Sequence, residues 1–357
     1  MVMWLNNEDA ERLMTPADYV AALEDGYREF GLGRVVERFP SRTHTYVPTT
    51  RDKVRFCCRT IEGGIPKLDA YSLRLNSEVP HEITVNGMRR KYKPPSIGDK
   101  YYFGLVFLFG LEDGRLRALI QDAYLNKMVT GATGALGVKY LSRPESSTVG
   151  IIGSGWQARG QLSAVAAVRK LTSVKVFSPT RETREAYARE MSKEIGVEVK
   201  PVESYEAAVR GVDIVITATN SYDSFLRGEW LEPGQHIDAM GGGDRWNKMR
   251  ELFVSAYQKA DVIAVNSVTA AQYDESADVM EAIKVGATSW EKMQDLGRII
   301  AGLDSGRTSP SQITLHRHHT GLGLWYTAAG QKLYEAAVAA KAGKELPDEI
   351  FYQIFVT

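Results

Sequence analysis

The chain has 357 residues, of which 44% are hydrophobic and 25% are charged, an ordinary globular balance that excludes general disorder. Its 44 basic and 44 acidic residues leave no formal net charge, which argues against a nucleic-acid or acidic-membrane partner. No stretch approaches the roughly 18 apolar residues of a membrane span, and the N-terminus lacks a signal-peptide layout. We therefore expect a soluble, cytoplasmic protein, and the length predicts two domains.

The first thirty residues predict a helical start. Apolar residues recur near the 3.6-residue period, Asn6 and Asn7 are candidate caps, and two glycines shortly after residue 30 would end the helix. Between residues 42 and 120, short runs such as THTYV and AYSLRLN are rich in β-branched and aromatic residues and predict an antiparallel β-rich region. The basic stretch HEITVNGMRRKYKPPSIGDK within this region predicts a long loop or hairpin.

Five short apolar runs alternate with amphipathic stretches between about residues 148 and 267. These runs are VGIIG, VKVFS, DIVITAT, HIDAMG and VIAVNS. Unbroken apolar runs of this length suit parallel strands that are covered on both faces. Their alternation with helices predicts an α/β fold with a Rossmann-like, doubly wound domain. Further helices are expected at about 121–140, before this region, and at about 323–342.

The sharpest motif follows the first of these runs. It reads Gly153-Ser154-Gly155-Trp156-Gln157-Ala158, the dinucleotide-binding pattern in its Gly-x-Gly-x-x-Ala form. Gly153 permits the tight turn, Gly155 lets the backbone approach the pyrophosphate, and Ala158 keeps the helix close to the strand. The free N–H groups at the start of that helix would then hold the phosphates.

The end of the next strand indicates which dinucleotide is bound. An NAD enzyme usually carries an acidic residue there, whereas this strand ends without one before Glu182. Ser178, Thr180 and Arg181, with Arg184 one turn further, instead offer hydroxyl and guanidinium groups that suit a 2′-phosphate. The alternative is that the arginines only decorate a solvated helix start. We predict NADP(H) in preference to NAD(H).

Two further polar segments are candidates for a role in the site. Thr219, Asn220 and Ser221 follow the fourth strand, whose carboxyl end faces the cofactor in such a sheet, so they either contact the nicotinamide side or close a turn. The run HRHH at 316–319 has no carboxylate or further histidine at familiar ligand spacing. We therefore predict no metal site.

These features together resemble the ornithine cyclodeaminase/mu-crystallin superfamily over nearly the whole chain. The resemblance rests on GxGxQA after VGII, on ATGALGVKYLSRPESS before it, on GVDIVITATNS and LEPGQHIDAMGGGD after it, and on the late ITLHRHHTGLGLWYTAAGQKLYEAA. The opening LNNEDAERLMTPADYVAALEDGYREFGLGR is similar to the first helices of that family.

The resemblance implies both an architecture and a kind of chemistry. Residues 126–321 would form the Rossmann-like NADP-binding domain, and residues 1–125, completed by 322–357, an α+β substrate-binding and dimerisation domain of a homodimer. The family includes cyclodeaminases that use NAD catalytically, amino-acid dehydrogenases, and ketimine or imino-acid reductases. All of them handle an amine or imine carbon beside a carboxylate, and the fold alone does not choose among them.

Two site residues carry over from the family pattern. The early arginine in a Pro-x-Arg setting matches Arg42, which can hold a substrate carboxylate bidentately, or is simply a surface arginine at a strand start. The aspartate after Gly-Gly matches Asp244, which would bind the substrate amine or help move its proton, or only forms a turn.

Two other positions depart from the family. The catalytic lysine aligns with Arg74, whose guanidinium is a poor acid or base at neutral pH, and the second arginine aligns with Val129. Either the substrate differs, or another basic residue supplies the amine. The lysines weighed for that role are Lys67, Lys91 and Lys93, of which the last two belong to a basic run that is otherwise a solvated loop. Lys127 lies near Val129 in sequence, at a helical position that points elsewhere.

We therefore predict an NADP(H)-dependent oxidoreductase that acts on a C–N bond, as an imine, ketimine or imino-acid reductase or an amino-acid dehydrogenase. Its catalytic residues would be Asp244, Arg42 and Arg74. The departures weigh against a cyclodeaminase, which needs a full proton-transfer set, and less against a reductase, where the cofactor supplies hydride. A cyclodeaminase-like lyase and a mu-crystallin-like ligand-binding protein remain as alternatives.

Overall fold

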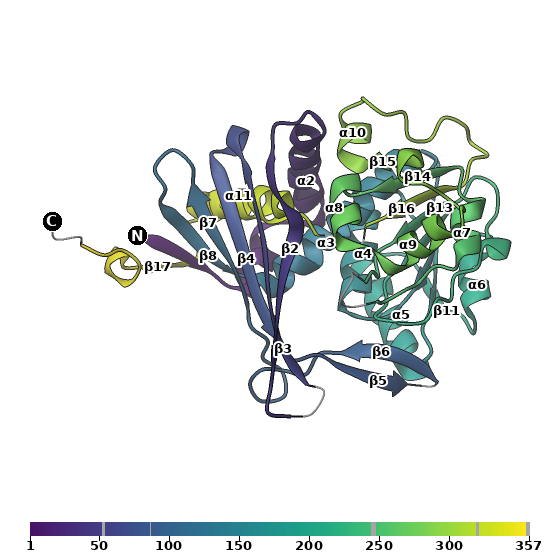
Figure 1. Cartoon of the computed structure of the whole chain (residues 1–357), viewed down its shortest axis with the longest axis horizontal. Coiled ribbons are helices and arrows are strands. Elements are labelled where there is room, and N and C mark those ends of the chain that lie inside the picture. The colour runs from purple at the N-terminus through teal and green to yellow at the C-terminus, as the bar shows by residue number, and fades with distance from the viewer. Residues whose placement is uncertain (52–53, 86, 244–247, 319–320, 355–357) are drawn as a thin grey trace.

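The computed structural model describes residues 1–51, 54–85, 87–243, 248–318 and 321–354. Two sheets stand side by side, a mixed one built from the N-terminal third and the C-terminus and a parallel one built from the rest (Figure 1). This arrangement confirms the predicted α/β class with a Rossmann-like sheet and a separate second sheet. The proposed division after residue 125 stays a prediction, and it falls inside a helix, α3 (Asp122–Leu141), which leads from one sheet to the other.

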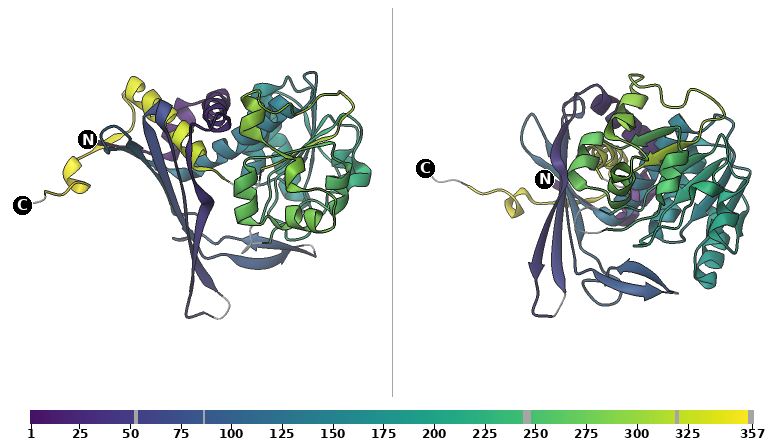
Figure 2. Two further views of the ribbon diagram at one scale, coloured as in Figure 1. Left: turned by 45° about the horizontal axis from the view of Figure 1, so that its top comes forward. Right: turned by 45° about the vertical axis from the view of Figure 1, so that its right-hand side comes forward.

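The first sheet has seven strands in the order β17-β1-β8-β7-β4-β3-β2. Neighbours pair antiparallel except β1 with β8. The strands are β1 (Val2–Leu5), β2 (Val36–Pro48), β3 (Arg55–Ile65), β4 (Ala70–Glu78), β7 (Gly104–Gly110), β8 (Leu116–Gln121) and β17 (Lys344–Leu346). Helix α11 (Gly323–Ala340) packs against one face of this sheet, and α2 (Pro16–Gly31) packs against α11 (Figure 2).

The start of the chain is more divided than its periodicity predicts. Residues 2–5 form strand β1, helix α1 (Asn7–Leu13) follows, and α2 begins anew at Pro16. Two capping boxes make these breaks, since the Asn6 and Thr15 side chains each accept a backbone N–H three residues further on. The single-helix start was wrong because the partners of β1 lie more than a hundred residues away, in β8 and β17.

The basic stretch after β4 forms a hairpin of β5 (His81–Val85) and β6 (Met88–Tyr92), as one of the two predicted forms. The hairpin reaches across to the parallel sheet, below α5 in Figure 1. The backbone N–H of Lys91 donates to the carbonyl of Asn220 at 3.1 Å, and the amide side chain of Asn220 donates to the carbonyl of Lys91 at 2.6 Å. The expected solvated loop is thus a bridge between the two halves.

The second sheet has eight parallel strands in the order β11-β10-β9-β12-β13-β16-β14-β15. Its strands are β9 (Thr148–Ile152), β10 (Ser173–Phe177), β11 (Val199–Pro201), β12 (Ile214–Thr217), β13 (His236–Ala239), β14 (Val262–Val265), β15 (Met293–Asp295) and β16 (Thr314–Arg317). All five predicted apolar runs form strands, because each is buried on both faces of the sheet. Strand β16 lies between β13 and β14 and includes the start of the histidine-rich run. It was not predicted.

Helices cover both faces of the parallel sheet (Figure 1). Besides α3 they are α4 (Trp156–Val168), α5 (Arg181–Ile195), α6 (Tyr205–Val209), α7 (Val254–Lys259), α8 (Val268–Asp274), α9 (Ala277–Lys284) and α10 (Leu296–Ile300). Short 3₁₀ turns lie at 66–68, 228–230, 290–292 and 348–350. Helix α3 packs closely on α4, where a Cβ at Gly131 would stand 2.2 Å from the carbonyl oxygen of Gly160. Met240 and His318, which directly follow β13 and β16, line a cavity together with residues of the first sheet.

Three further observations concern the described residues. Cys57 and Cys58 are both free thiols. Among the helices that the structure describes, none is long and apolar enough to cross a membrane. Within the same residues, no group of three or more His, Cys, Asp or Glu side chains is placed to hold a metal ion.

Candidate active site

The glycine motif makes the turn that a dinucleotide requires. Gly153 has φ +117°, in the range that favours glycine, and a Cβ there would stand 2.3 Å from the carbonyl oxygen of Ala218. A Cβ at Gly155 would meet nothing within 4 Å, so the backbone there faces open space. Gly155 caps α4 without any side-chain hydrogen bond, which leaves the first N–H groups of the helix for the phosphates. This cradle fits a pyrophosphate.

A cavity of about 450 Å³ lies over this turn, at the carboxyl ends of β9, β10 and β12. It receives Met88 and Arg90 from the β5–β6 hairpin, so both halves of the molecule form it. Its wall includes every predicted cofactor residue except Arg181, namely Gly153, Ser154, Gly155, Trp156, Gln157, Ser178, Thr180, Thr219, Asn220 and Ser221. The dimensions and the helix start suit a nicotinamide dinucleotide.

The groups at the end of β10 divide into those that face the cavity and those that do not. The hydroxyl of Ser154 lies 3.0 Å from that of Ser178 and 3.2 Å from that of Thr183, which forms a hydroxyl cluster at the wall. Arg181 is exposed to 74% and pairs with Glu185 one turn along α5 at 2.7 Å. Arg184 is buried, and it donates to the Ser178 carbonyl at 3.1 Å and pairs with a surface glutamate. Arg184 therefore supports the strand end.

The segment after β12 lines the cavity and closes a turn, and its predicted contact with the nicotinamide stays a prediction. The Thr219 N–H and hydroxyl donate to Glu251 at 2.7 and 2.8 Å, and the Ser221 hydroxyl donates to the carbonyl of Asp223. Glu251 also accepts the Thr217 hydroxyl, and burial raises the pKa of its carboxyl group. These bonds hold the segment in place at the wall of the cavity.

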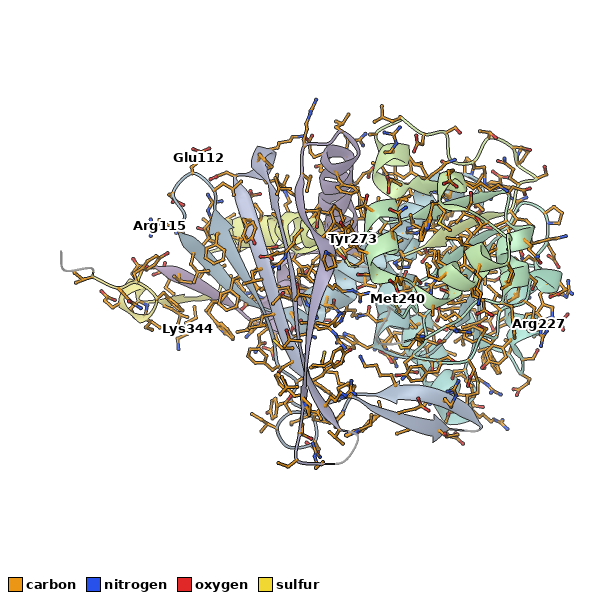
Figure 3. All side chains as sticks on the ribbon, viewed as in Figure 1. Glu112, Arg115, Arg227, Met240, Tyr273 and Lys344 are labelled. Carbon is orange, nitrogen blue, oxygen red and sulfur yellow. The ribbon has the colours of Figure 1, made fainter. Side chains whose placement is uncertain are left out.

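A second cavity of about 270 Å³ adjoins the first, since Gln157 and Met240 line both. Met240 follows β13 and lies between the two halves (Figure 3). The remaining lining residues come from the first sheet, the end of the β5–β6 hairpin, α3, the end of β16, and α11 with the residue before its cap: Arg42, Arg59, Ile61, Arg74, Asn76, Lys93, Asn126, Thr130, His318, Gly321, Trp325 and Tyr326. The Asn76 and Gln157 side-chain oxygens are buried there without a hydrogen-bond partner in the described structure. The cavity thus offers acceptors as well as cations to a small ligand.

The two predicted catalytic arginines both reach this second cavity. Arg42 lies 3.4 Å from Asp274, and Arg74 forms two bonds with Asp122, of 2.8 Å from Nε and 2.6 Å from Nη2. Arg74 also lies over the ring of Tyr326, 5.2 Å from its centroid. Burial alone would lower the pKa of Arg74, but Tyr326 and Asp122 outweigh it and raise that pKa. Arg74 is therefore a fixed cation at the cavity wall.

The candidate lysines lie in different places. Lys67 is 60% exposed and pairs with Glu29 at 3.0 Å, outside the cavity wall. Lys91 binds Glu78 at 2.5 Å, and Lys93, which lines the cavity, lies 3.7 Å from the same carboxylate. Burial lowers the pKa of both hairpin lysines. Of the three lysines considered from the sequence, only Lys93 lines the second cavity.

Val129 and Lys127 are not among the residues that line the second cavity. Val129 is fully buried in the hydrophobic core. Lys127 lies over the rings of Tyr124 and Trp156, at 5.2 and 4.8 Å from their centroids, and it is not among the residues that line the second cavity. The predicted Asp244 lies outside the described residues, as do positions 319 and 320 of the histidine-rich segment.

Sequence reasoning missed two contributors to the two cavities, Arg90 and His318. Arg90 belongs to the basic run, which was interpreted mainly as solvated, and its place at the cavity depends on where the hairpin folds. His318 was weighed only as part of a metal cluster, yet it lines the second cavity and bonds Asp238 of β13 at 2.9 Å. The signal for it was the unusual density of histidines directly after a buried strand.

One curated relative and two solved structures show what the chain resembles. A Delta(1)-pyrroline-2-carboxylate reductase from Bacillus cereus is 33% identical over 251 residues, which cover 70% of this chain and 76% of that protein. The Thermococcus litoralis Delta(1)-pyrroline-2-carboxylate reductase, solved with NADH and L-proline, superposes with a TM-score of 0.82 at 25% identity and covers 97% of this chain and 100% of that one. An archaeal alanine dehydrogenase dimer with bound NAD gives a TM-score of 0.82 at 26% identity, over 98% of this chain and 99% of that one.

These relatives confirm the prediction of an enzyme of the NAD(P)-dependent imino-acid reductase and amino-acid dehydrogenase type. They confirm a nicotinamide dinucleotide as the cofactor without distinguishing NADP from NAD. The family model for ornithine cyclodeaminase/mu-crystallin proteins matches residues 88–341, well over half of the chain. The chain therefore belongs to the ornithine cyclodeaminase/mu-crystallin family.

Proposed function

We propose that the protein is an NADP(H)-dependent reductase of small imines that carry a carboxylate, or the corresponding amino-acid dehydrogenase, and that it works as a homodimer. The observation that carries this proposal is the cationic cavity that adjoins the dinucleotide cradle. When bound, the reduced nicotinamide supplies a hydride to the carbon that bears the nitrogen.

The charge in the second cavity supports a carboxylate substrate. Arg59 and Lys91 share Glu78, and Arg42 and Arg74 each face one aspartate. Burial alone would raise the pKa of Glu78, but Lys91 and Arg59 outweigh it and lower that pKa to about 2. Lys93 adds a further cation, so among the described residues the cations at this cavity outnumber the carboxylates that face them. A ligand anion would balance the excess.

Three residues receive specific roles in this proposal. Arg42 binds the substrate carboxylate, and Arg74, held by Asp122, keeps that end of the cavity positive. Asp244 binds the substrate nitrogen. The hydroxyls of Ser178 and Thr180, with Arg181 beside them, favour the 2′-phosphate of NADP(H), since no carboxylate among these residues would repel it. The residue division at 125/126 and 321/322 is proposed as the boundary between the two functional parts.

The direct test follows nicotinamide absorbance with NADPH or NADH against cyclic imino acids, 2-oxo acids with ammonia, and matched imines without a carboxylate. We expect NADPH consumption with carboxylate-bearing imines and little with their uncharged counterparts. Consumption that ignores the carboxylate would refute the role of the cationic cavity. Ammonia release from a diamino acid without net cofactor consumption would identify a cyclodeaminase instead, and nucleotide binding without any turnover would identify a binding protein.

The role of Asp244 is tested with Asp244→Ala in the same assay. Turnover should fall sharply because the substrate nitrogen loses its carboxylate partner, whereas binding of NADPH should be retained. Activity close to that of the unaltered protein would contradict the assignment.

A further inference from the structure

Three buried polar side chains meet where β13 and β16 end beside the second cavity. One carboxylate oxygen of Asp238 lies 2.8 Å from Nδ1 of His316, and the other lies 2.9 Å from Nε2 of His318. Asp238 and His316 are fully buried, and His318 is exposed to only 2%. The two rings stack with centroids 4.9 Å apart. None of these groups has a role in the site as described so far.

The packing of α3 encloses this cluster. A Cβ at Gly134 would stand 2.5 Å from a carboxylate oxygen of Asp238, and a Cβ at Gly137 would stand 2.3 Å from Nδ1 of His316. Only glycine at these positions lets the helix backbone approach so closely. The helix thereby keeps water away from the carboxylate, and in such surroundings hydrogen bonds to a charged group are strong.

The two histidines differ in what their second nitrogen meets. Nε2 of His316 lies 3.2 Å from the side-chain oxygen of Asn266, so both ring nitrogens of His316 have protein partners. Nδ1 of His318 is buried without a hydrogen-bond partner in the described structure, and His318 lines the substrate cavity. A carboxylate only accepts, so Nε2 of His318 carries the hydrogen toward Asp238. Nδ1 is therefore the nitrogen left for a ligand.

The electrostatics of the cluster determine the charge states of Asp238 and His316. Burial alone would raise the pKa of Asp238, but the two imidazoles outweigh it and hold that pKa well below its ordinary range, so the carboxylate stays ionised. Burial lowers the pKa of His316, which keeps its ring neutral. His318 is the member of the cluster that lines the cavity, and its Nδ1 has no hydrogen-bond partner in the described structure.

We propose that Asp238 and His318 form the proton-transfer pair of this enzyme, in the role for which the family uses a lysine and this chain has Arg74. This inference rests on the proposed function and adds the identity of its acid and base. In reduction the Nδ1–H bond of protonated His318 breaks and a new N–H bond forms on the imine nitrogen. The reduced dinucleotide supplies the hydride to carbon, and water returns a proton to His318. In the opposite direction neutral His318 accepts the proton of the amine.

Other charges around the pair set how readily it holds a proton. The cations at the cavity wall disfavour a protonated imidazole, and the carboxylate of Asp238 favours it. Each of those cations has a carboxylate beside it: Arg42 has Asp274, Arg74 has Asp122, and Arg59 and Lys93 have Glu78. The described charged groups that face the pair or the cavity are Arg42, Arg59, Arg74, Lys93, Glu78, Asp122, Asp274 and, beside the pair, Arg317 with Asp278. Among the described carboxylates, Asp238 is the one bonded to the His318 ring.

The first experiment compares His318→Gln and Asp238→Asn with the unaltered protein. Glutamine keeps a donor near the position of Nε2 and removes Nδ1. We expect kcat for imine reduction to fall about 100-fold or more in H318Q, with unchanged binding of NADPH by calorimetry. In the unaltered protein kcat/KM should fall as pH rises, because the protonated ring is the acid. That decline should move to lower pH in D238N and be absent in H318Q.

His236→Asn is the matched control. His236 is buried on the same strand as Asp238, at its other end, where Nδ1 contacts the Thr314 hydroxyl at 2.9 Å, and it does not line the cavity. We expect H236N to keep both kcat and the pH profile. Unaltered turnover and an unaltered pH profile in H318Q would overturn the proposal.

A measurement without turnover separates this inference from the proposed function. Nitrogen NMR of labelled histidine, with H318Q to assign the signals, should show the hydrogen of neutral His318 on Nε2, toward Asp238, and Nδ1 without one. A His318 ring in the other tautomer, or a tautomer that is the same in D238N, would overturn the pair. If the protein consumed NAD(P)H with none of the imines, the proposed function would be refuted. The NMR result would then still decide whether Asp238 and His318 act as a pair.

Discussion

Arg181 and Arg184 lie one turn apart at the start of α5, but their surroundings give them different roles. Arg184 is buried, stacks over Phe177 with 5.6 Å to the ring centroid, and donates to the carbonyl of Ser178. Arg181 is largely exposed, with Glu185 as its ion-pair partner. An exposed pair of this kind contributes little to stability, so Arg181 can turn toward a 2′-phosphate at small cost.

We therefore expect Arg181→Ala to weaken the binding of NADPH by about tenfold or more and that of NADH by much less, because only NADPH carries the 2′-phosphate. Dissociation constants for both dinucleotides, measured by fluorescence quenching, test this. Arg189→Ala on the same helix is the control. Equal losses for the two dinucleotides in R181A would remove the case for NADP(H).

Glu37 lies in strand β2 of the first sheet and links this strand to the start of α11. Its carboxylate accepts the N–H groups of Gly323 and Leu324 at 2.8 and 2.6 Å. Burial raises the pKa of Glu37 to about 8, against the opposing effect of these two donors. The folded protein thus holds this proton at pH values where the unfolded chain has lost it.

The sign of the resulting pH dependence follows from linkage. The stability contributed by protonated Glu37 is complete below the ordinary pKa of 4.5 and is lost as pH rises toward about 8. We expect the free energy of unfolding to decline over that interval, and to decline less in Glu37→Gln, which cannot ionise. Urea unfolding at several pH values measures both slopes. Identical slopes for the two proteins would contradict the assignment.

At the scale of elements, the glycines of α3 allow this helix to pack closely against its neighbours. It packs on α4 and over the polar cluster of β13 and β16, and most of its residues are buried. The motif ATGALG was recognised in the sequence as part of a family resemblance. The structure supplies the physical reason, which is close approach of the helix backbone to α4 and to buried polar groups.

We expect Gly131→Ala to destabilise the protein by about 1–3 kcal/mol, because the new Cβ would stand 2.2 Å from a backbone carbonyl that cannot move freely. Gly330→Ala in α11 is the matched control, since its Cβ would meet its nearest atom at 3.5 Å. There the better helix propensity of alanine should leave stability unchanged or raise it by up to about 1 kcal/mol. Urea unfolding of both variants decides, and equal effects would contradict the packing argument.

The whole molecule places its chemistry between two sheets. The parallel sheet brings the carboxyl ends of its strands to the opening, and the mixed sheet, α3, α11 and the hairpin complete the two cavities from the other side. Neither half contains a complete site by itself. Apolar side chains also remain exposed on β2 and β3 and before β7, namely Val47, Phe56, Tyr101, Tyr102 and Phe103. Such exposure is typical of surfaces that a partner covers.

We therefore expect a homodimer, with a mass in solution about twice the 39.6 kDa of the chain. Light scattering after size-exclusion chromatography measures this mass directly over a range of concentrations. A mass of one chain at all concentrations would refute the dimer, and dissociation only on dilution would give its strength.

The sequence by itself determined the features that depend on neighbouring residues. Apolar runs buried on both faces identify parallel strands, and the tight turn at Gly153 requires glycine whatever lies around it. The α/β class, the dinucleotide cradle and the capping at Asn6 follow from such local rules. The family resemblance then supplied the kind of reaction.

Only the tertiary structure decided the groups that meet across long stretches of chain. Strand β1 exists because β8 and β17 pair with it, and Lys93 reaches the cavity because the hairpin folds across the opening. Asp238 and His318 are 80 residues apart in the sequence and come within 2.9 Å through the order of strands in the sheet. Periodicity and motif spacing report local conformation, whereas the chemistry of a buried group depends on distant partners that the fold brings to it.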